Sequence, residues 1–468
     1  MKILMLIYAF FLPTATGFLF VSYFSRCDNK ESFFERLFLG FGLGMGMLTF
    51  EMFITALLKI NFSLFVISLM QILTAALFAW LLFRSKYSLK EVLNVSPFRD
   101  KITSIFKVSG VQSFFVLLVT IWIMLKFFFV LYESATWPAF GWDSLENWSS
   151  GAKYFYYVKG LMLDHGSEHF FGKGYRTFLN YPLHIPLMQV WVSVCLGNIN
   201  EAYMKYWNVV YFISVVALVY FAVRREASQV IAILAAFFLS SVPLLTYHAI
   251  DAYADLPLSY YALATAICFR RYMEKSEKQR DENYGFLVLI GVFSALCMWT
   301  KLEGILFALA FSATLLLYLL LKRSSYRNFI KSLFFYSLPI GIIGISWFTF
   351  LTLNGVKGRS ILAFGLHFEV IPVILKQIFF SANFNIIFLF SPLIILLGIR
   401  TILHSDLKYL LAHLLMVMLM FLFIYIATNN YIFAMNLTAV NRSVLTFIPA
   451  MYYISALIAA HMLGKEKD

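Results

Sequence analysis

The chain has 468 residues, of which 61% are hydrophobic and 19% aromatic, and its mean hydropathy is +0.80. A soluble domain cannot bury that much apolar surface, so the composition excludes a soluble enzyme and predicts an integral membrane protein. The formal net charge is +13. We attribute this charge to membrane topology and to contact with anionic lipids, and we expect no nucleic-acid partner. The four cysteines are scattered and indicate neither a disulfide framework nor a metal site.

Runs of about 20 apolar residues predict about thirteen transmembrane helices in an all-α fold. These spans lie near residues 3–24, 34–58, 61–84, 112–133, 203–223, 227–246, 254–273, 284–300, 302–322, 332–353, 383–400, 407–428 and 443–463. We divide the chain into an N-terminal three-helix membrane module (1–84), a basic cytoplasmic linker (85–111) and a membrane core (112–468) that contains a long outer loop (134–202).

The distribution of Lys and Arg predicts the orientation, because basic residues concentrate in cytoplasmic loops. Alternate connections between the predicted helices, such as those around Arg84, Arg224 and Arg270, hold 24 of the 37 basic residues. We therefore expect a multi-pass protein of the cell membrane with its N-terminus outside and its C-terminus in the cytoplasm. The loop 134–202 then lies on the extracytoplasmic side.

Three apolar segments of the outer loops predict helices near the membrane surface. In the first, apolar residues recur at helical spacing between 145 and 158, as in an amphipathic surface helix. The second segment, 186–196, is expected to lie on the interface or to dip into it. The third segment, 370–380, is expected to be an interfacial helix.

The outer loop opens on two acids beside tryptophans. Asp143 and Glu146 are spaced as in an N-terminal capping box, which is one interpretation. The other interpretation is catalytic, with Asp143 as the general base for a substrate hydroxyl and Glu146 beside it. Trp142 and Trp148 would then offer apolar faces to sugar rings, although tryptophans at membrane surfaces also form an aromatic belt.

Ionisable residues near other outer helix ends are candidates for substrate binding, because charge at membrane depth is costly. Asp255 and the stretch 300–303 also resemble helix starts, so helix capping is the alternative at these positions. A phosphate at the membrane surface would be held by cations such as Lys301 or Arg442. The candidates for substrate binding beyond the outer tryptophans are Lys153, His184, His248, Asp251, Asp255, Lys301, Glu303 and Arg442.

Two charged residues lie inside predicted helices rather than at their ends. Glu51 and Lys126 are each about 10 Å below the outer end of their helix. Their similar depth permits pairing, which would dock the N-terminal module onto the core; the alternative is that Lys126 extends toward the interface.

The order of these residues resembles that of a known family. The sequence contains Trp142-Asp143, Trp148, Ala152-Lys153, Tyr181-Pro182-Leu183-His184-Ile185-Pro186, Tyr253-Ala254-Asp255-Leu256-Pro257, Thr300-Lys301-Leu302-Glu303-Gly304 and Asn441-Arg442. Together they resemble bacterial membrane glycosyltransferases of the GT-C fold class, of the protein-mannosyltransferase kind, over residues 112–463. Residues 1–84 do not match the minimal pattern and look like an added module.

The resemblance implies inverting transfer of a sugar from a polyprenyl-phosphate carrier to a hydroxyl of a glycan, lipid or protein at the outer face. Asp143 is then the expected catalytic base with Glu146 beside it, and Lys301 and Arg442 are expected to hold the donor phosphate. Asp255 is expected to assist or, like Asp143, to bind a divalent metal such as Mg²⁺ or Mn²⁺.

Two other functions remain open from the sequence. One is a transporter or flippase of lipid-linked sugars, and the other is a non-catalytic partner in cell-envelope assembly. Transporters place their polar site near the bilayer midplane, whereas the acids of this chain gather at the predicted outer surface.

Overall fold

The computed structural model describes residues 2–26, 32–85, 110–278, 284–322, 325–357 and 363–464, which form helices, two isolated β-bridges and no strand. Nearly all of the predicted linker 85–111 lies outside the described residues. The helices are α1 (Lys2–Phe24), α2 (Phe33–Leu57), α3 (Leu64–Arg84), α6 (Val111–Thr136), η1 (Ser144–Ser149), α7 (Ser150–Tyr157), η2 (Phe170–Gly172), α8 (His184–Leu196), α9 (Glu201–Met204), α10 (Tyr206–Arg224), α11 (Gln229–Ser240), α12 (Pro243–Ile250), α13 (Asp255–Lys278), α14 (Tyr284–Thr300), α15 (Gly304–Leu321), α16 (Tyr326–Leu353), α17 (Val370–Phe380), α18 (Ile387–Leu397), α19 (Ile399–Leu403), α20 (Leu407–Ala427), α21 (Tyr431–Met435), α22 (Val440–Leu445) and α23 (Ile448–Met462).

Each predicted membrane span corresponds to a helix or to a pair of helices. Eight of the described helices are long and apolar enough to cross a membrane, and α11 with α12, which are bent by 64°, would make a ninth span. The shorter apolar helices α14, α18 and α23 occupy three further predicted spans, and α13 occupies another. The all-α membrane fold is confirmed, whereas thirteen crossings stay a prediction.

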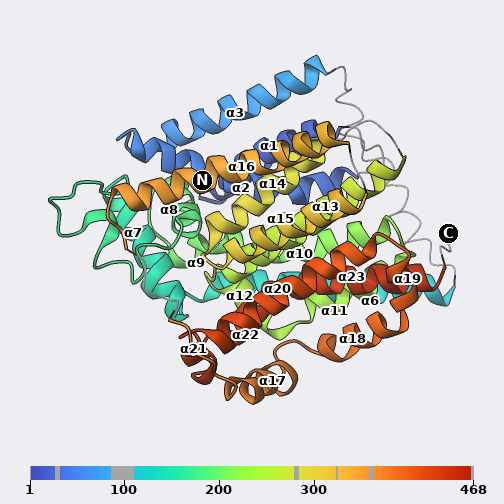
Figure 1. The fold of residues 1–468 in the computed structure, drawn as a ribbon. Helices are drawn as coiled ribbons and strands as arrows, with labels where there is room; N and C mark the ends of the chain where they lie inside the picture. Colours follow the sequence, from blue (N-terminus) through green and yellow to red (C-terminus); the bar gives the residue numbers. More distant parts are fainter. Residues whose placement is uncertain are drawn as a thin grey trace.

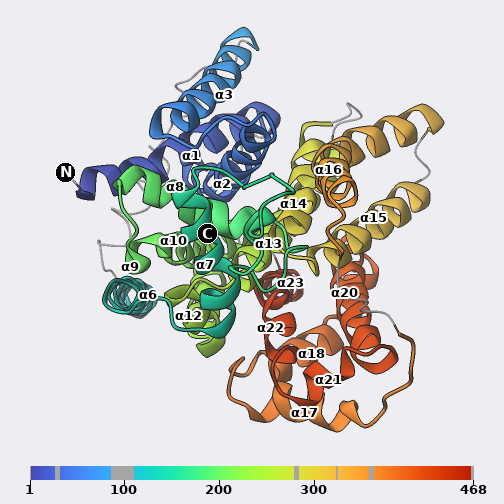
Figure 2. The same ribbon diagram turned by 90° about the vertical axis from the view of Figure 1, so that its left-hand side faces the viewer.

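The helices run side by side and leave two distinct ends (Figure 1). Helices α7, α8 and α21 lie toward one end, whereas α19 and the C-terminus lie at the other. Viewed toward the first end, α13 lies near the middle of the bundle (Figure 2). It packs against α14, α10, α23 and α2, so its first residue is surrounded by the connections at that end.

Glycines on α2 dock the first helices onto the rest of the chain. A Cβ on Gly44 would lie 1.8 Å from the carbonyl oxygen of Pro13, so α1 and α2 touch through their backbones. A Cβ on Gly42 would lie 2.1 Å from a ring carbon of Tyr260 on α13. The Tyr260 hydroxyl also donates a hydrogen bond to the Leu39 carbonyl over 2.9 Å. Helix α2 therefore packs against both α1 and the central helix.

The first part of the outer loop packs its apolar side chains against protein. The predicted helix over 145–158 is present as η1 and α7, and its apolar residues Trp148, Ala152 and Phe155 are fully buried. Helix α7 packs on α8, whose own side chains are mostly buried. Each segment covers the apolar face of the other, and the expectation that 145–158 lies on the membrane surface and that 186–196 lies on or dips into the interface stays a prediction.

The predicted interfacial helix in the later outer loop is present as α17. It begins at Val370 and ends at Phe380, the predicted bounds. Leu375 and Phe380 are 48% and 82% exposed, so α17 turns apolar side chains outward from the protein. Contact of this surface with lipid stays a prediction.

The predicted ion pair between Glu51 and Lys126 is not formed in the described structure. Glu51 instead accepts hydrogen bonds from Gln71 Nε2 and Thr74 Oγ1, both over 2.7 Å. The Lys126 ammonium lies 5.3 Å from the ring centroid of Phe129. Glu51 therefore links α2 to α3 and not to the core.

Candidate functional site

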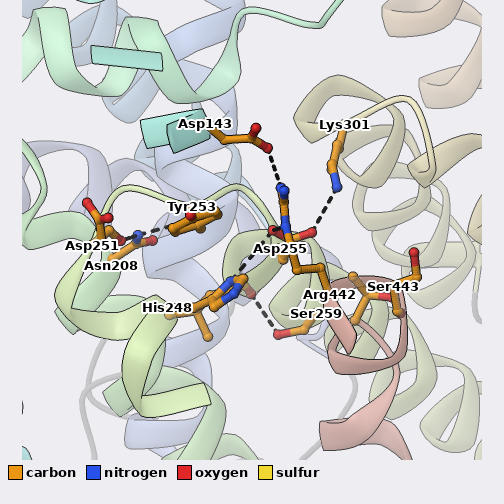
Figure 3. Close-up of polar contacts among 12 residues, drawn as sticks. Asp143, Asn208, His248, Asp251, Tyr253, Asp255, Ser259, Lys301, Arg442 and Ser443 are labelled. Atoms are coloured by element: carbon orange, nitrogen blue, oxygen red, sulfur yellow. Dashed lines mark hydrogen bonds and ion pairs between the residues drawn. The ribbon is translucent and has the colours of Figure 1, made fainter. Parts of the chain in front are cut away.

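Four segments that are far apart in the sequence bring charged side chains together (Figure 3). Asp143 precedes η1, Asp255 is the first residue of α13, Lys301 lies in the turn between α14 and α15, and Arg442 lies on α22. Ion pairs connect all four residues, each of which the sequence had indicated. We call these four residues the charged cluster.

Asp255 anchors the charged cluster, because its fully buried carboxylate is paired through both oxygens. Lys301 Nζ donates to Oδ1 over 2.8 Å, and Arg442 Nε donates to Oδ2 over 3.1 Å. His248 Nδ1 lies 3.6 Å from Oδ2 and is also buried. A buried carboxylate is tolerated only with such compensation. Asp255 and the two cations therefore fix one another's positions.

Arg442 joins the two carboxylates of the charged cluster. Its Nη2 donates to Asp143 Oδ2 over 2.5 Å, while its Nε donates to Asp255. The guanidinium carbon also lies 4.9 Å from the ring centroid of Tyr253, and this ring packs on His248 with centroids 4.5 Å apart. Two anions and an aromatic face thus hold the guanidinium.

Asp251 positions the segment that carries Asp143 without joining the charged cluster. Asp251 Oδ2 accepts a hydrogen bond from the Gly141 amide over 2.6 Å, and Oδ1 accepts one from the Ser144 hydroxyl over 2.7 Å. Asn208 Nδ2 donates to the Asp251 carbonyl. Because Asp251 is fully buried with both oxygens occupied, its predicted substrate-binding role is replaced by a positioning role.

Neither predicted capping box is formed. Asp143 has helical backbone angles (φ −63°, ψ −34°), and its side chain caps no amide of η1. The Glu303 side chain likewise does not cap α15, and its Oε1 lies 3.0 Å from Lys301 Nζ. Asp143 instead precedes a π-helical turn, a rare geometry that is frequent at functional sites. Its carboxylate is therefore available to Arg442.

Both cations of the charged cluster stay protonated at physiological pH. Burial lowers the pKa of Lys301, but the carboxylates of Asp255 and Glu303 raise it more, so the pKa lies above its usual value. Burial likewise lowers the pKa of Arg442, and the carboxylates of Asp255 and Asp143 more than reverse this effect. The cluster therefore presents two permanent positive charges.

The two tryptophans beside the acids have different environments. Trp148 is fully buried and stacks on Tyr181, with ring centroids 5.5 Å apart. Its ring is covered by protein in this structure, so contact between Trp148 and a sugar stays a prediction without structural support. Trp142 is 58% exposed, and its ring remains accessible.

Two other predicted residues lie outside the charged cluster. The Lys153 ammonium pairs with the carboxylate of Glu201, so it serves to tie α7 to α9. Glu146 is exposed and lines a pocket of about 310 Å³ together with Ser150 and Thr177. The structure therefore separates Glu146 from Asp143, although only three positions divide them in the sequence.

His184 is a buried connection between helices and not an outer cation. Its Nδ1 lies 2.7 Å from Thr49 Oγ1 on α2, and its Nε2 lies 3.0 Å from the Tyr261 hydroxyl on α13 and 3.3 Å from that of Tyr211 on α10. The side chain is fully buried. Four helices enclose its ring, so the structure gives His184 a role in helix packing, and substrate binding by it stays a prediction.

Two tyrosines at the site were missed from the sequence. Tyr253 supports Arg442, as described above. Tyr181 stacks on Trp148, and burial together with the charge of Glu303 raises the pKa of its phenol above the usual value. Both tyrosines lie in stretches that carry the family resemblance, but tyrosine is common at membrane surfaces for other reasons, so neither was singled out as a site residue.

The residues predicted to bind a divalent metal do not fit that role. In the described parts of the chain, no three His, Cys, Asp or Glu side chains are grouped as metal ligands would be. Both oxygens of Asp255 are paired with cations, and Asp143 shares Arg442 with it. A metal ion would have to displace one of these side chains.

One comparison with known proteins bears on this site. Residues 182–350, a little over a third of the chain, match the family model described as dolichyl-phosphate-mannose-protein mannosyltransferase. The match supports a GT-C-like membrane glycosyltransferase. It includes Asp255 and Lys301 but neither Asp143 nor Arg442. No curated protein and no solved structure matches the chain.

Proposed function

We propose that the protein is a membrane glycosyltransferase of the mannosyltransferase kind that moves a sugar from a polyprenyl-phosphate carrier to a hydroxyl acceptor at the outer face, with inversion at the sugar C1. The observation that carries this proposal is the charged cluster, in which the accessible carboxylate of Asp143 lies beside two fixed cations. The family match supports glycosyl transfer in a membrane.

We assign Asp143 as the general base. Its side chain is 14% exposed, whereas that of Asp255 is fully buried, so a substrate reaches Asp143 and not Asp255. The acceptor hydroxyl gives its proton to Asp143 while its oxygen forms the new bond to C1. One base suffices, because the phosphate is a good leaving group, whereas glycoside hydrolysis needs two carboxyl groups.

We assign Lys301 and Arg442 to the donor phosphate. As the bond between C1 and the phosphate oxygen breaks, the electron pair stays on that oxygen, and the nearby cations stabilise the developing negative charge. Asp255 does not touch the substrate in this scheme. It positions both cations through its two oxygens.

The base assignment is tested by Asp143→Asn, which keeps the shape of the side chain but removes the proton acceptor. We expect transfer from a lipid-linked sugar in isolated membranes to fall by about 10²- to 10⁴-fold, with the amount of folded protein unchanged. Asp164→Asn, in the same outer loop, is the matched control and should keep its activity. Full activity of Asp143→Asn would contradict the assignment.

The phosphate assignment is tested separately by Arg442→Ala and Lys301→Ala. Each variant removes one charged hydrogen-bond donor, so affinity for the lipid-phosphate donor should fall by about 10- to 100-fold. Lys153→Ala removes a lysine that pairs with Glu201 and should leave this affinity unchanged. Unaltered donor affinity in both cluster variants would remove Lys301 and Arg442 from the leaving-group site.

A further inference from the structure

The carboxylates in and beside the charged cluster already balance the charge of both cations. Lys301 and Arg442 face the carboxylates of Asp143 and Asp255, and Glu303 adds a third acid 3.0 Å from Lys301. His248, which also faces Asp255, is fully buried, and burial of this kind disfavours a further cation. A phosphate entering this arrangement would meet an excess of negative charge. One carboxylate must therefore leave its cation when the phosphate binds.

Asp143 is the carboxylate that can leave. Asp255 is enclosed at the start of α13 and is paired through both oxygens. Among the described residues, the Asp143 carboxylate pairs with Arg442 alone, and it lies in a partly exposed segment before a π-helical turn. Without Asp143, Arg442 keeps its contacts with Asp255 and with the Tyr253 ring, so the guanidinium stays in position with its Nη2 edge free.

We propose that Asp143 occupies, in the free protein, the edge of the Arg442 guanidinium that binds the donor phosphate, so that carboxylate and phosphate compete for it. This inference rests on the proposed glycosyl transfer and gives Asp143 a second role in it. The donor must bind first, because its phosphate displaces Asp143 from Arg442. Only then is the carboxylate free to accept a proton from the acceptor hydroxyl.

The same competition assists release of the product. After transfer, the acceptor proton is on Asp143, and the lipid phosphate carries the electron pair of the broken bond. A protonated Asp143 does not compete for Arg442, so the phosphate stays bound. Once the proton passes to water, the charged carboxylate regains Arg442 and weakens the hold on the lipid phosphate.

The test measures binding of a short polyprenyl monophosphate, farnesyl phosphate, to the purified full-length protein in detergent micelles. Asp143→Asn should bind it on the order of tenfold more tightly than the unmodified protein, because one charged hydrogen bond no longer competes. Asp143→Ala should show a similar gain, which guards against an effect of the asparagine amide. Farnesol, which lacks the phosphate, should bind all three proteins alike.

Two controls make the result specific. Glu146→Gln removes an equal charge three positions away but outside the charged cluster, and it should give no gain. In an Arg442→Ala background, Asp143→Asn should no longer tighten binding, as a double-mutant cycle requires for a shared partner. Equal or weaker binding by both Asp143 variants would overturn the proposal, and so would an equal gain in Glu146→Gln or in the Arg442→Ala background.

Activity separates this inference from the proposed function. If Asp143→Asn is inactive but binds farnesyl phosphate no more tightly, the competition is wrong and the base assignment stands. If Asp143→Asn binds more tightly yet transfers sugar normally, the competition stands and the base assignment is wrong.

Discussion

The ring of Tyr253 is uncharged, so its effect on the site can be measured without changing the charge of the cluster. It is 8% exposed and contacts both the guanidinium of Arg442 and the imidazole of His248. A cation over an aromatic face in such a desolvated place is stabilised by up to about 2 kcal/mol. The ring therefore sets where Arg442 sits without changing the charge of the cluster.

A variant that replaces the Tyr253 ring with an aliphatic side chain should transfer sugar more slowly. A variant that keeps an aromatic ring at this position should not. We expect Tyr253→Leu to lower kcat/KM for the lipid-linked donor by about tenfold, because the guanidinium loses its aromatic support. Tyr253→Phe keeps the ring face and should stay within about twofold of the unmodified protein. Equal losses in both variants would mean that the hydroxyl, and not the ring, supports the site.

The charged cluster could be predicted residue by residue, but the roles within it could not. The sequence indicated three of its members, because a charged residue at an outer helix end is costly and is therefore a candidate for function. They are Asp255, Lys301 and Arg442. Asp251 stood out for the same reason, yet its carboxylate holds the Gly141 amide, 110 positions away in the sequence. The sequence around Asp251 does not reveal a hydrogen-bond partner that is so distant in the chain. Burial of His184 likewise depends on helices that are distant in the chain.

Among the structural elements, the segment before η1 controls the direction of the Asp143 side chain. Its Gly141 has no room for a Cβ, which would lie 2.4 Å from the Tyr253 hydroxyl and 2.6 Å from Asp251 Oδ2. Any larger residue must push the segment away from these two side chains. The glycine thus places Asp143 without touching the charged cluster.

Gly141→Ala should therefore impair activity although no charged residue changes. We expect transfer to fall by about tenfold or more, with a loss of folding free energy of about 1–3 kcal/mol from overpacking, measured by thermal unfolding in detergent. Gly160→Ala in the same outer loop is the control, because the nearest atom to its Cβ would be 3.9 Å away. Normal activity of Gly141→Ala would show that the segment is not held as described.

The bounds of a helix were predicted correctly where they depend on its own sequence. The burial of a helix against a distant segment was not predicted. The bounds of α17 follow from its own apolar run between polar loops. The helix over 145–158 was also predicted, but its burial against α8 was not, because an apolar stripe suits a membrane or another helix equally. The π-helical turn after Asp143 has the same sequence signature as a capped α-helix.

On the scale of the whole molecule, charged side chains gather at the helix ends opposite the cluster as well. Arg270 donates to both oxygens of Glu226, and His461 Nε2 lies 3.2 Å from one of them. Glu226 follows α10, Arg270 lies in the last third of α13, and His461 is the next-to-last residue of α23. All three are close to connections that the Lys and Arg distribution assigns to the cytoplasm. The charged cluster would then face outward.

Cysteine labelling in intact cells tests this orientation. With Cys27 replaced by Ser, a thiol reagent that cannot cross membranes should label Glu168→Cys, in the outer loop, from outside the cell. His404→Cys, which lies between α19 and α20, should react only after permeabilisation. The remaining cysteines, Cys195, Cys268 and Cys297, are buried and should stay silent. The reverse pattern would place the charged cluster on the cytoplasmic side.

The charged cluster also has a consequence for synthesis of the chain. Arg442 follows Asp255 by 187 positions, which at about 5–20 residues per second means a delay of roughly 10–40 s. Lys301 follows Asp255 by 46 positions, so for most of this interval it is the only cation of the cluster that has been made, and the Arg442 guanidinium is still missing. Synthesis of α22 therefore completes the charge pairing of the cluster. Under the proposed function, a chain stalled before that helix would carry the acids but lack one of the two cations assigned to the donor phosphate.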